Sequence, residues 1–368
     1  MTNFQLPKTL LAIGQSARML VKMAKDSGLR VIAVDQFADF DTCKMADAYF
    51  QIKSLTKADL ISTIEHIKSH YAIDLVIYGS GFETCPDSLT YLNEHWPIAG
   101  NPASCFDLIE NKVWLFSKLA LLNIRFPIVS FTQPNQTDQW LQKPYASLGG
   151  QHVIYFQPDL KQPKLKSYWQ RYCPGKNFSA LFISDGQKIQ IIGFNQQFSV
   201  KTCHSDFAFS AIRNQATLPL SQQQQISDWL YKLINLLPLR GLGSLDFIFD
   251  GDQCWFLEIN PRIPASAQLY GPSILEQHLS ATNGQLDQIS MVSELHRVYK
   301  VFYAPKNLRI SKHIIWPNWI SDRPAAGAFI GQGEPICSMI VSGKTSRQVS
   351  LEVFRRQRFM EKLLKTGS

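Results

Sequence analysis

The sequence has no apolar run that approaches the ~18 residues needed for a membrane-spanning helix. It also has no C-x-x-C pair, and its seven cysteines are widely scattered. An odd number of cysteines without regular spacing indicates reduced thiols in the cytoplasm rather than a disulfide framework. The opening residues contain one lysine and a short apolar stretch ending at Gly14, which favours a buried strand over a signal peptide. These absences predict a cytoplasmic protein with no membrane partner.

Composition and charge are those of a globular protein. Hydrophobic residues make up 45% of the 368 residues and charged residues 18%. This length predicts two or three packed units rather than one core. The net charge is +8, but the only dense basic stretch is residues 354–368. No zinc-finger, RNP or basic-region pattern accompanies the charge, so we expect no nucleic-acid partner. A net positive charge also suits the binding of anionic small molecules.

The first hundred residues alternate between apolar strands and amphipathic helices, which is typical of a parallel α/β domain. The pattern predicts a helix at 16–26 and strands at 9–13, 29–34 and 74–78. Only Gly14 follows the first strand, so the glycine fingerprint of a dinucleotide site is missing.

A glycine-bearing loop follows the strand at 74–78. Ligands bind at the carboxyl ends of parallel strands, so the candidate substrate residues in this loop are Gly79, Ser80, Gly81 and Glu83. The surrounding residues do not form the G-x-S-x-G elbow of a serine hydrolase.

The strongest pattern is a predicted hairpin within residues 243–262. Two apolar strands, 245–249 and 254–259, flank the turn sequence Asp250-Gly251-Asp252. Antiparallel pairing over this turn can bring together the candidate metal ligands Asp246, Glu258 and Asn260. Carboxylate and amide oxygens suit Mg²⁺ (or Mn²⁺), and Arg262 continues the same face. The alternative is an ordinary hairpin with an acidic edge, which the two charges within apolar strands disfavour.

Three further segments carry candidate nucleotide-binding residues. Lys143-Pro144 ends a predicted strand and leads into a flexible loop with Ser147, Gly149 and Gly150, which can surround a phosphate. Lys112, near the start of a helix predicted to run to about Leu122, is the second candidate phosphate lysine. Residues 168–175 read as a strand entering a turn that can line an adenine. Each segment alone also fits an ordinary surface loop or helix.

Taken in order, these segments resemble the ATP-grasp superfamily. The similarity covers roughly residues 1 to 335 and is strongest from 110 to 265. The sequence most resembles the ATP-dependent carboligases related to biotin carboxylase, which also have Trp-Pro and Asp-Arg-Pro motifs like those at 316 and 322.

The resemblance implies an ATP-grasp fold of α/β and α+β units, with a Rossmann-like domain before two lobes that enclose ATP. The implied domains are a Rossmann-like pre-ATP-grasp domain at 1–102, a small lobe at 103–180, a large lobe with the metal site at 181–300, and a strand-rich extension with a closing helix at 301–368. The residues implied to bind ATP are Lys112, Lys143, Ser147, Gly149, Gly150, Gln170, Tyr172, Cys173 and Asn177. Asp246, Glu258 and Asn260 would hold Mg²⁺ (or Mn²⁺), and Arg262 would act as the catalytic residue on an acyl phosphate.

Two positions depart from the pattern of the relatives. Asn177 stands where many have a glutamate for the ribose hydroxyls, and Ser244 stands where amino-acid ligases often have an arginine. An amide still hydrogen-bonds a hydroxyl, so ATP binding is compatible with Asn177.

The leading hypothesis is an ADP-forming ligase that joins a small-molecule carboxylate to an amine in amino-acid or cofactor biosynthesis. A bicarbonate-activating carboxylase and a nucleotide-binding scaffold without turnover are the alternatives. The resemblance also suggests a homodimer, although nothing in the residues fixes the oligomeric state.

Overall fold

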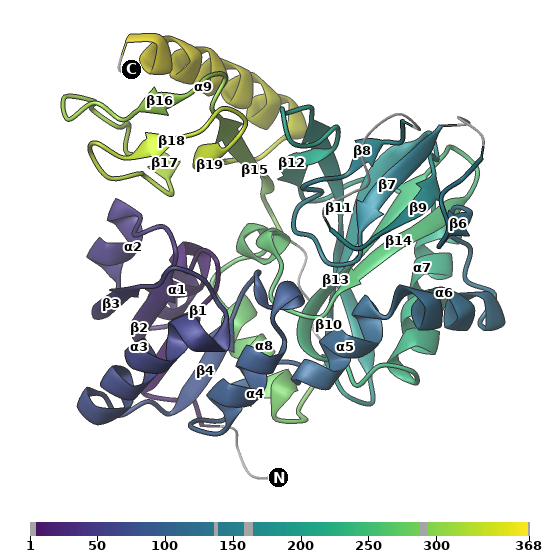
Figure 1. Cartoon of the computed structure of the whole chain (residues 1–368), viewed down its shortest axis with the longest axis horizontal. Coiled ribbons are helices and arrows are strands. Elements are labelled where there is room, and N and C mark those ends of the chain that lie inside the picture. The colour runs from purple at the N-terminus through teal and green to yellow at the C-terminus, as the bar shows by residue number, and fades with distance from the viewer. Residues whose placement is uncertain (1–4, 136–138, 158–164, 287–292, 367–368) are drawn as a thin grey trace.

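The computed structural model describes residues 5–135, 139–157, 165–286 and 293–366. Its described strands form a five-stranded parallel sheet, a four-stranded antiparallel sheet, an eight-stranded antiparallel sheet and a two-stranded ladder. Figure 1 shows the parallel sheet in the N-terminal unit, with the two larger antiparallel sheets beside it.

The N-terminal unit is a parallel α/β sheet with the strand order β3-β2-β1-β4-β5. Its elements are β1 (Thr9–Ile13), α1 (Arg18–Asp26), β2 (Arg30–Asp35), α2 (Phe40–Met45), β3 (Ala48–Gln51), α3 (Lys57–His70), β4 (Leu75–Tyr78), η1 (Phe82–Thr84), α4 (Asp87–Asn93) and β5 (Ile98–Ala99). Every residue of β1 is buried, because helices cover both faces of the sheet. The three predicted strands and the helix at 16–26 are confirmed to within two residues.

Two helices meet at a break before the four-stranded sheet. α5 (Ala103–Glu110) ends at Asn111, whose side chain accepts a hydrogen bond from the Trp114 amide and so caps α6 (Lys112–Leu121). The predicted helix therefore begins at Lys112, and Glu110 belongs to the helix before it. The sheet that follows has the order β6-β9-β7-β8, with β6 (Val129–Ser130), β7 (Trp140–Pro144), β8 (Ile154–Tyr155) and β9 (Ser167–Arg171).

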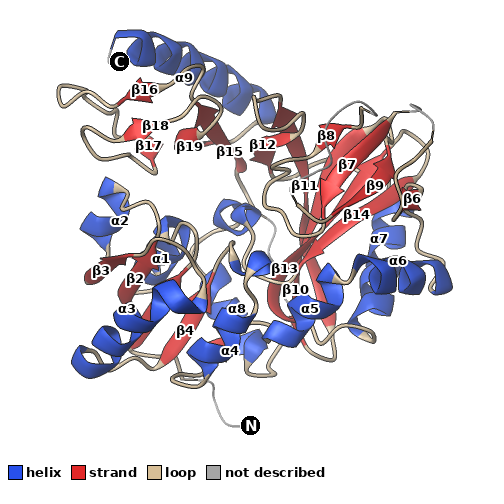
Figure 2. Ribbon diagram, in the orientation of Figure 1, coloured by secondary structure: helices blue, strands red, loops and turns tan. Residues whose placement is uncertain are grey.

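The eight-stranded sheet has the order β14-β13-β10-β11-β12-β15-β19-β17. Its elements and their connections are β10 (Lys176–Asp185), β11 (Ile189–Val200), β12 (Ala208–Arg213), α7 (Leu220–Ile234), β13 (Arg240–Phe249), β14 (Cys254–Asn260), η2 (Ala265–Leu269), α8 (Ile274–Thr282), β15 (His296–Tyr303), β17 (Ile320–Ser321) and β19 (Pro335–Gly343). The predicted hairpin is confirmed as β13–β14. Figure 2 shows α7 lying against one side of this sheet.

The two faces of β10 and β13 differ in chemistry. Phe182, Phe247 and Phe256 are buried in one core with Trp229 of α7. The cross-strand neighbours Asn195, Ser179, Asp246 and Glu258 share the other face. Toward Leu181, Ile183 and Leu242 this second face is apolar and packs against α8, so the polar part is the end at Ser179 and Asp246, where a site can form.

The C-terminal segment extends the same sheet. β15, β17 and β19 join it, and β16 (Leu308–Arg309) and β18 (Phe329–Ile330) pair beside them. The closing helix α9 (Ser346–Thr366) confirms the helix predicted there. The domain limits remain predictions; the limits at 180/181 and 300/301 fall inside β10 and β15.

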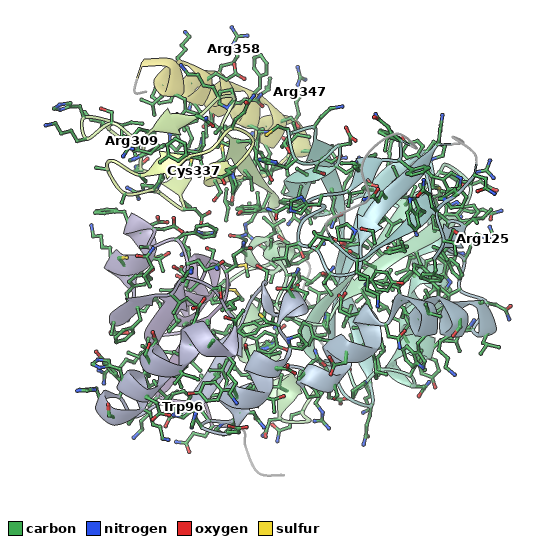
Figure 3. All side chains as sticks on the ribbon, viewed as in Figure 1. Trp96, Arg125, Arg309, Cys337, Arg347 and Arg358 are labelled. Carbon is green, nitrogen blue, oxygen red and sulfur yellow. The ribbon has the colours of Figure 1, made fainter. Side chains whose placement is uncertain are left out.

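The basic C-terminal stretch lies on α9. Figure 3 labels Arg347 and Arg358, which are exposed on this helix. Arg355 and Arg356 both pair with Glu352, at 2.8 and 2.6 Å. Part of the positive charge is therefore neutralised within the helix. Among the residues that the structure describes, no helix combines the length and apolar character that crossing a membrane would require.

Candidate functional site

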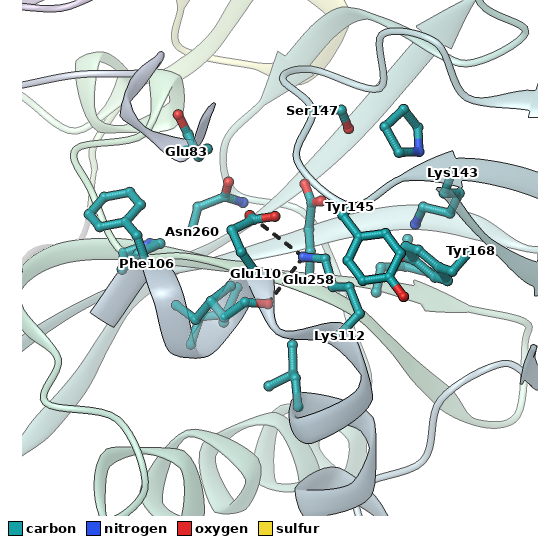
Figure 4. A pocket seen from close by; sticks show the side chains of 16 residues that line it. Glu83, Phe106, Glu110, Lys112, Lys143, Tyr145, Ser147, Tyr168, Glu258 and Asn260 are labelled. Carbon is teal, nitrogen blue, oxygen red and sulfur yellow. Dashed lines mark hydrogen bonds and ion pairs between the residues drawn. The ribbon is translucent and has the colours of Figure 1, made fainter. Parts of the chain in front are cut away.

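A pocket lies between the α5–α6 junction, the four-stranded sheet and the β13–β14 hairpin. It encloses about 570 Å³ of space, including part that is open to solvent. Its lining consists of Glu83, Phe106, Ile109, Glu110, Lys112, Leu115, Lys143, Pro144, Tyr145, Ser147, Tyr168, Leu257, Glu258, Ile259, Asn260 and Pro261. Figure 4 shows lysine and carboxylate side chains from different elements turned toward one another here.

Two predicted phosphate lysines enter this pocket from different parts of the chain. The Lys143 Nζ donates to Gln170 Oε1 at 3.1 Å and lies 5.9 Å from the centre of the Tyr168 ring. Burial lowers the pKa of Lys143, while the negative charges of Glu258 and Asp246 act in the opposite direction. The Lys112 Nζ donates to the Ile109 carbonyl at 3.2 Å and lies 3.6 Å from Glu110 Oε1.

The predicted metal ligands face one another across the hairpin. Asp246 pairs in register with Glu258, and Ser244 with Asn260. Asp246 is 9% exposed, and its Oδ1 has no hydrogen-bond partner. Burial raises the pKa of Asp246, and the negative charge of Glu258 raises it further. Arg262 offsets only part of this rise. A divalent cation would supply further positive charge between the two carboxylates.

The donor set fits Mg²⁺ that is shared with a nucleotide. Among the described residues, no three His, Cys, Asp or Glu side chains form a group able to hold a metal ion. Two carboxylates suffice when phosphate oxygens complete the shell. Asn260 Oδ1 accepts a hydrogen bond from Arg262 Nη2 at 3.1 Å, and its Nδ2 lies 3.4 Å from Asp246 Oδ2. Asn260 therefore needs an amide rotation before its oxygen can face a cation beside Asp246.

Arg262 joins this hairpin to the N-terminal unit. Its Nε lies 2.8 Å from Glu83 Oε1, and the two side chains are 12% and 7% exposed. Glu83 Oε2 accepts a hydrogen bond from the Gly81 amide at 2.7 Å. Gly81 has a φ of +117°, which a residue with a Cβ rarely adopts. Of the predicted substrate loop, Glu83 lines the pocket, whereas Gly79, Ser80 and Gly81 do not.

The glycine loop contacts the large sheet more than the pocket. Ser147 lines the pocket, and Gly149 and Gly150 do not. The Gly149 carbonyl accepts from the Phe209 amide at 2.8 Å, and the Gly150 carbonyl accepts from Ser205 Oγ at 2.7 Å. Gly150 has a φ of +70°, and a Cβ there would lie 2.2 Å from the Phe207 carbonyl oxygen. The loop thus bridges the two antiparallel sheets.

The predicted adenine segment lies beside the pocket. Gln170 is buried in β9 and holds Lys143. The Tyr172 amide donates to the Gln139 carbonyl at 2.7 Å, and its ring lies 5.6 Å from that of Tyr155. Cys173 is partly exposed, and Asn177 pairs with Ile248 in β13. None of these four residues lines the pocket.

Sequence reasoning assigned no function to several of the residues that line the pocket. Phe106, Ile109 and Leu257 are apolar, and nothing in their spacing distinguishes them from core positions. Tyr145 could have been found, because strand alternation places it two residues after Lys143 on the same face. Glu110 stands two residues before Lys112, but a helix boundary at Asn111 is needed to bring both into one pocket.

Comparison with known proteins identifies the fold that carries this pocket. Residues 109–266 match the model of the ATP-grasp domain. The uncharacterised protein MJ0776 of Methanocaldococcus jannaschii is 23% identical over 356 residues, which span 90% of this chain and 87% of that protein.

Solved structures resemble this chain over most of its length, among them the following three. Rhizobium etli pyruvate carboxylase has a TM-score of 0.73 and 14% identity; the match covers 96% of this chain and 39% of that one. Campylobacter jejuni biotin carboxylase, in a complex with β,γ-ATP, has a TM-score of 0.70 and 14% identity, with 94% and 90% covered. Staphylococcus aureus N5-carboxyaminoimidazole synthetase has a TM-score of 0.69 and 15% identity, with 96% and 98% covered. The predicted fold class is confirmed: residues 109–266 are an ATP-grasp domain, and the chain as a whole has the ATP-grasp fold.

Proposed function

We propose that the chain is an ATP-dependent ligase that activates a carboxylate as an acyl phosphate and joins it to an amine, releasing ADP and phosphate. One observation carries the proposal: Lys112 and Lys143 share a pocket with Glu258 and Asn260. The buried Asp246 stands opposite Glu258 in the hairpin, and Arg262 contacts Asn260. Two lysines, a two-carboxylate cation site and an arginine are the charges that a phosphoryl transfer needs.

The proposed role of each residue follows from where its side chain lies in or beside the pocket. Lys112 and Lys143 hold the phosphates of ATP from two sides. Asp246, Glu258 and Asn260 hold Mg²⁺ (or Mn²⁺), which when bound would neutralise phosphate charge. Arg262 steadies the charge on the acyl phosphate, and Glu83 keeps the guanidinium in place through its 2.8 Å contact.

The remaining nucleotide contacts are proposed from neighbouring elements. Ser147, Gly149 and Gly150 would cover the phosphates, and Gln170, Tyr172 and Cys173 would meet the adenine. Asn177 would reach the ribose. The substrates are a small-molecule carboxylate and an amine of amino-acid or cofactor biosynthesis, and the proposed assembly is a homodimer. Seven free cysteines support a cytoplasmic location for this enzyme.

A substrate screen tests the proposed function. The purified chain, ATP and Mg²⁺ are incubated with a panel of carboxylates crossed with amines, and released ADP and AMP are quantified. ADP that requires both a carboxylate and an amine supports the ligase. AMP release contradicts it, because AMP indicates adenylation. ADP release that requires only bicarbonate indicates a carboxylase, the chemistry named for two of the structural neighbours.

Lys143→Ala should weaken ATP binding at least about tenfold, or about 1.4 kcal/mol. The ammonium is fixed by Gln170 at the pocket wall, and alanine cannot replace a charged phosphate contact. Calorimetric titration of nucleotide measures the change. Lys188→Ala, an exposed lysine between β10 and β11, is the matched control and should bind ATP normally. Unchanged affinity in folded Lys143→Ala would remove this residue from the site.

A further inference from the structure

Glu110 is a half-buried carboxylate in the pocket that the proposed phosphoryl transfer does not use. It ends α5 and lines the pocket beside Lys112. Its Oε2 is inaccessible and has no hydrogen-bond partner, and its Oε1 lies 3.6 Å from the Lys112 Nζ. A buried carboxylate oxygen without a partner is costly, so it needs an explanation.

Lys112 is an incomplete partner for Glu110. The distance of 3.6 Å is long for a charge-assisted hydrogen bond. In the proposed reaction Lys112 also has to serve a phosphate, and one ammonium cannot fully neutralise both groups. Burial, together with the negative charges of Glu83 and Glu258, raises the pKa of Glu110 to about 7, and Lys112 opposes that rise. The carboxylate of Glu110 is therefore stabilised when a second positive group arrives.

Glu110 lies beside one of the two proposed phosphate lysines, Lys112, and away from the other, Lys143. In Figure 4, Glu110 lies between Lys112 and the side where Glu83 and Asn260 stand, whereas Lys143, Tyr145 and Tyr168 occupy the opposite side. Glu83 already has a partner on each oxygen, namely Arg262 and the Gly81 amide. Asp246 and Glu258 are engaged in the proposed metal site. Of the carboxylates that line the pocket, Glu110 is thus the one left for a cationic substrate group.

We propose that Glu110 binds the amine substrate in its protonated form, so that the enzyme prefers amines that are positively charged in solution over neutral nucleophiles. The bound ammonium gives up one proton to solvent at the open side of the pocket before its nitrogen attacks the acyl phosphate. The inference rests on the proposed ligase function. An ammonium group would give the Glu110 carboxylate, whose side chain is 22% exposed, a second positive partner and would sit next to the hairpin where the acyl phosphate is to form. The ligand class is an aliphatic amine that is protonated at neutral pH.

The test compares two kinds of nucleophile on the full chain, with the carboxylate that is active in the screen. Hydroxylamine is uncharged at neutral pH and reports acyl phosphate formation. The charged probes are ammonium, methylammonium and the protonated amines active in the screen. Glu110→Gln should raise KM for the charged amines about tenfold, equivalent to about 1.4 kcal/mol. KM for hydroxylamine and for ATP should stay near the wild-type values, and Glu110→Asp should recover part of the loss.

A control variant and the possible outcomes distinguish a failure of this inference from a failure of the proposed ligase function. Glu94→Gln, an exposed glutamate in the N-terminal unit, should leave every constant unchanged. Equal losses for charged amines and hydroxylamine would overturn the inference, as would a raised Mg²⁺ requirement without a change in amine KM. So would a wild-type enzyme that uses hydroxylamine but no protonated amine. A wild-type chain that releases no ADP with any nucleophile contradicts the proposed function instead.

Discussion

Glu258→Gln should reduce turnover by about a hundredfold to a thousandfold at saturating ATP. Glutamine keeps the shape of the side chain and removes one of the two charges proposed to hold Mg²⁺. Glu258 lines the pocket and pairs in register with Asp246, whereas Asp250 and Asp252 lie in the turn of the hairpin and do not line the pocket. The rate should be measured over a range of Mg²⁺ and Mn²⁺ concentrations, with Glu94→Gln as the control.

The same substitution should leave the protein folded, which separates a lost metal ligand from a lost fold. Without a cation the two carboxylates repel one another, and this repulsion adds to burial in raising the pKa of Asp246. Removing one charge relieves this repulsion. The melting temperature of Glu258→Gln without Mg²⁺ should therefore equal or exceed that of the wild type. Normal turnover at low Mg²⁺ would show that the metal assignment is wrong.

The hairpin was predictable because its turn sets its register. Asp250 Oδ1 accepts hydrogen bonds from the amides of Asp252 and Gln253, at 2.9 and 2.8 Å, and Gly251 has a φ of +113°. A short-range turn of this kind depends only on adjacent residues. The turn sets the pairing as far as Phe247 with Phe256. A β-bulge between Asp246 and Phe247 then shifts the register by one residue, so Asp246 pairs with Glu258 rather than with Leu257, and counting from the turn does not give this pair. The parallel N-terminal sheet was predictable for a similar reason, since its strands are continuous apolar runs.

Contacts between distant segments were not predictable in the same way. Glu83 and Arg262 are 179 residues apart, and their ion pair depends on how the N-terminal unit packs against the hairpin. The sequence placed Glu83 in a substrate loop and Arg262 on the metal face, without any reason to join them. The orientation of the Asn260 amide is another such case, because it depends on Arg262 and Asp246 together. No periodicity along the chain encodes these pairings.

Arg262→Ala should lower the rate of the chemical step about a hundredfold while changing ATP affinity little. Its guanidinium is held between Glu83 and Asn260 rather than at the lysine end of the pocket. Its proposed partner is charge that develops only as the phosphoryl group moves, so its loss should affect kcat more than binding. Single-turnover measurement of ADP formation and calorimetric titration of ATP give the two quantities separately.

Removing Arg262 also leaves Glu83 buried without its ionic partner, a defect that typically costs about 3–5 kcal/mol. The double variant Arg262→Ala/Glu83→Gln removes both charges and serves as the control for this loss of stability. If the double variant regains the melting temperature but not the rate, the arginine acts on the reaction itself. If the rate returns with the stability, Arg262 has a structural role only.

An isotope experiment then tests the step assigned to Arg262. With ¹⁸O in the carboxylate substrate, attack on the γ-phosphoryl group places one labelled oxygen between carbon and phosphorus. Amine attack on the carbonyl carbon breaks the carbon–oxygen bond, so the label should leave in the released phosphate. Arg262→Ala should slow the appearance of labelled phosphate in proportion to kcat. A loss of ATP affinity alone, with unchanged label transfer, would assign Arg262 to the bound nucleotide instead of the acyl phosphate.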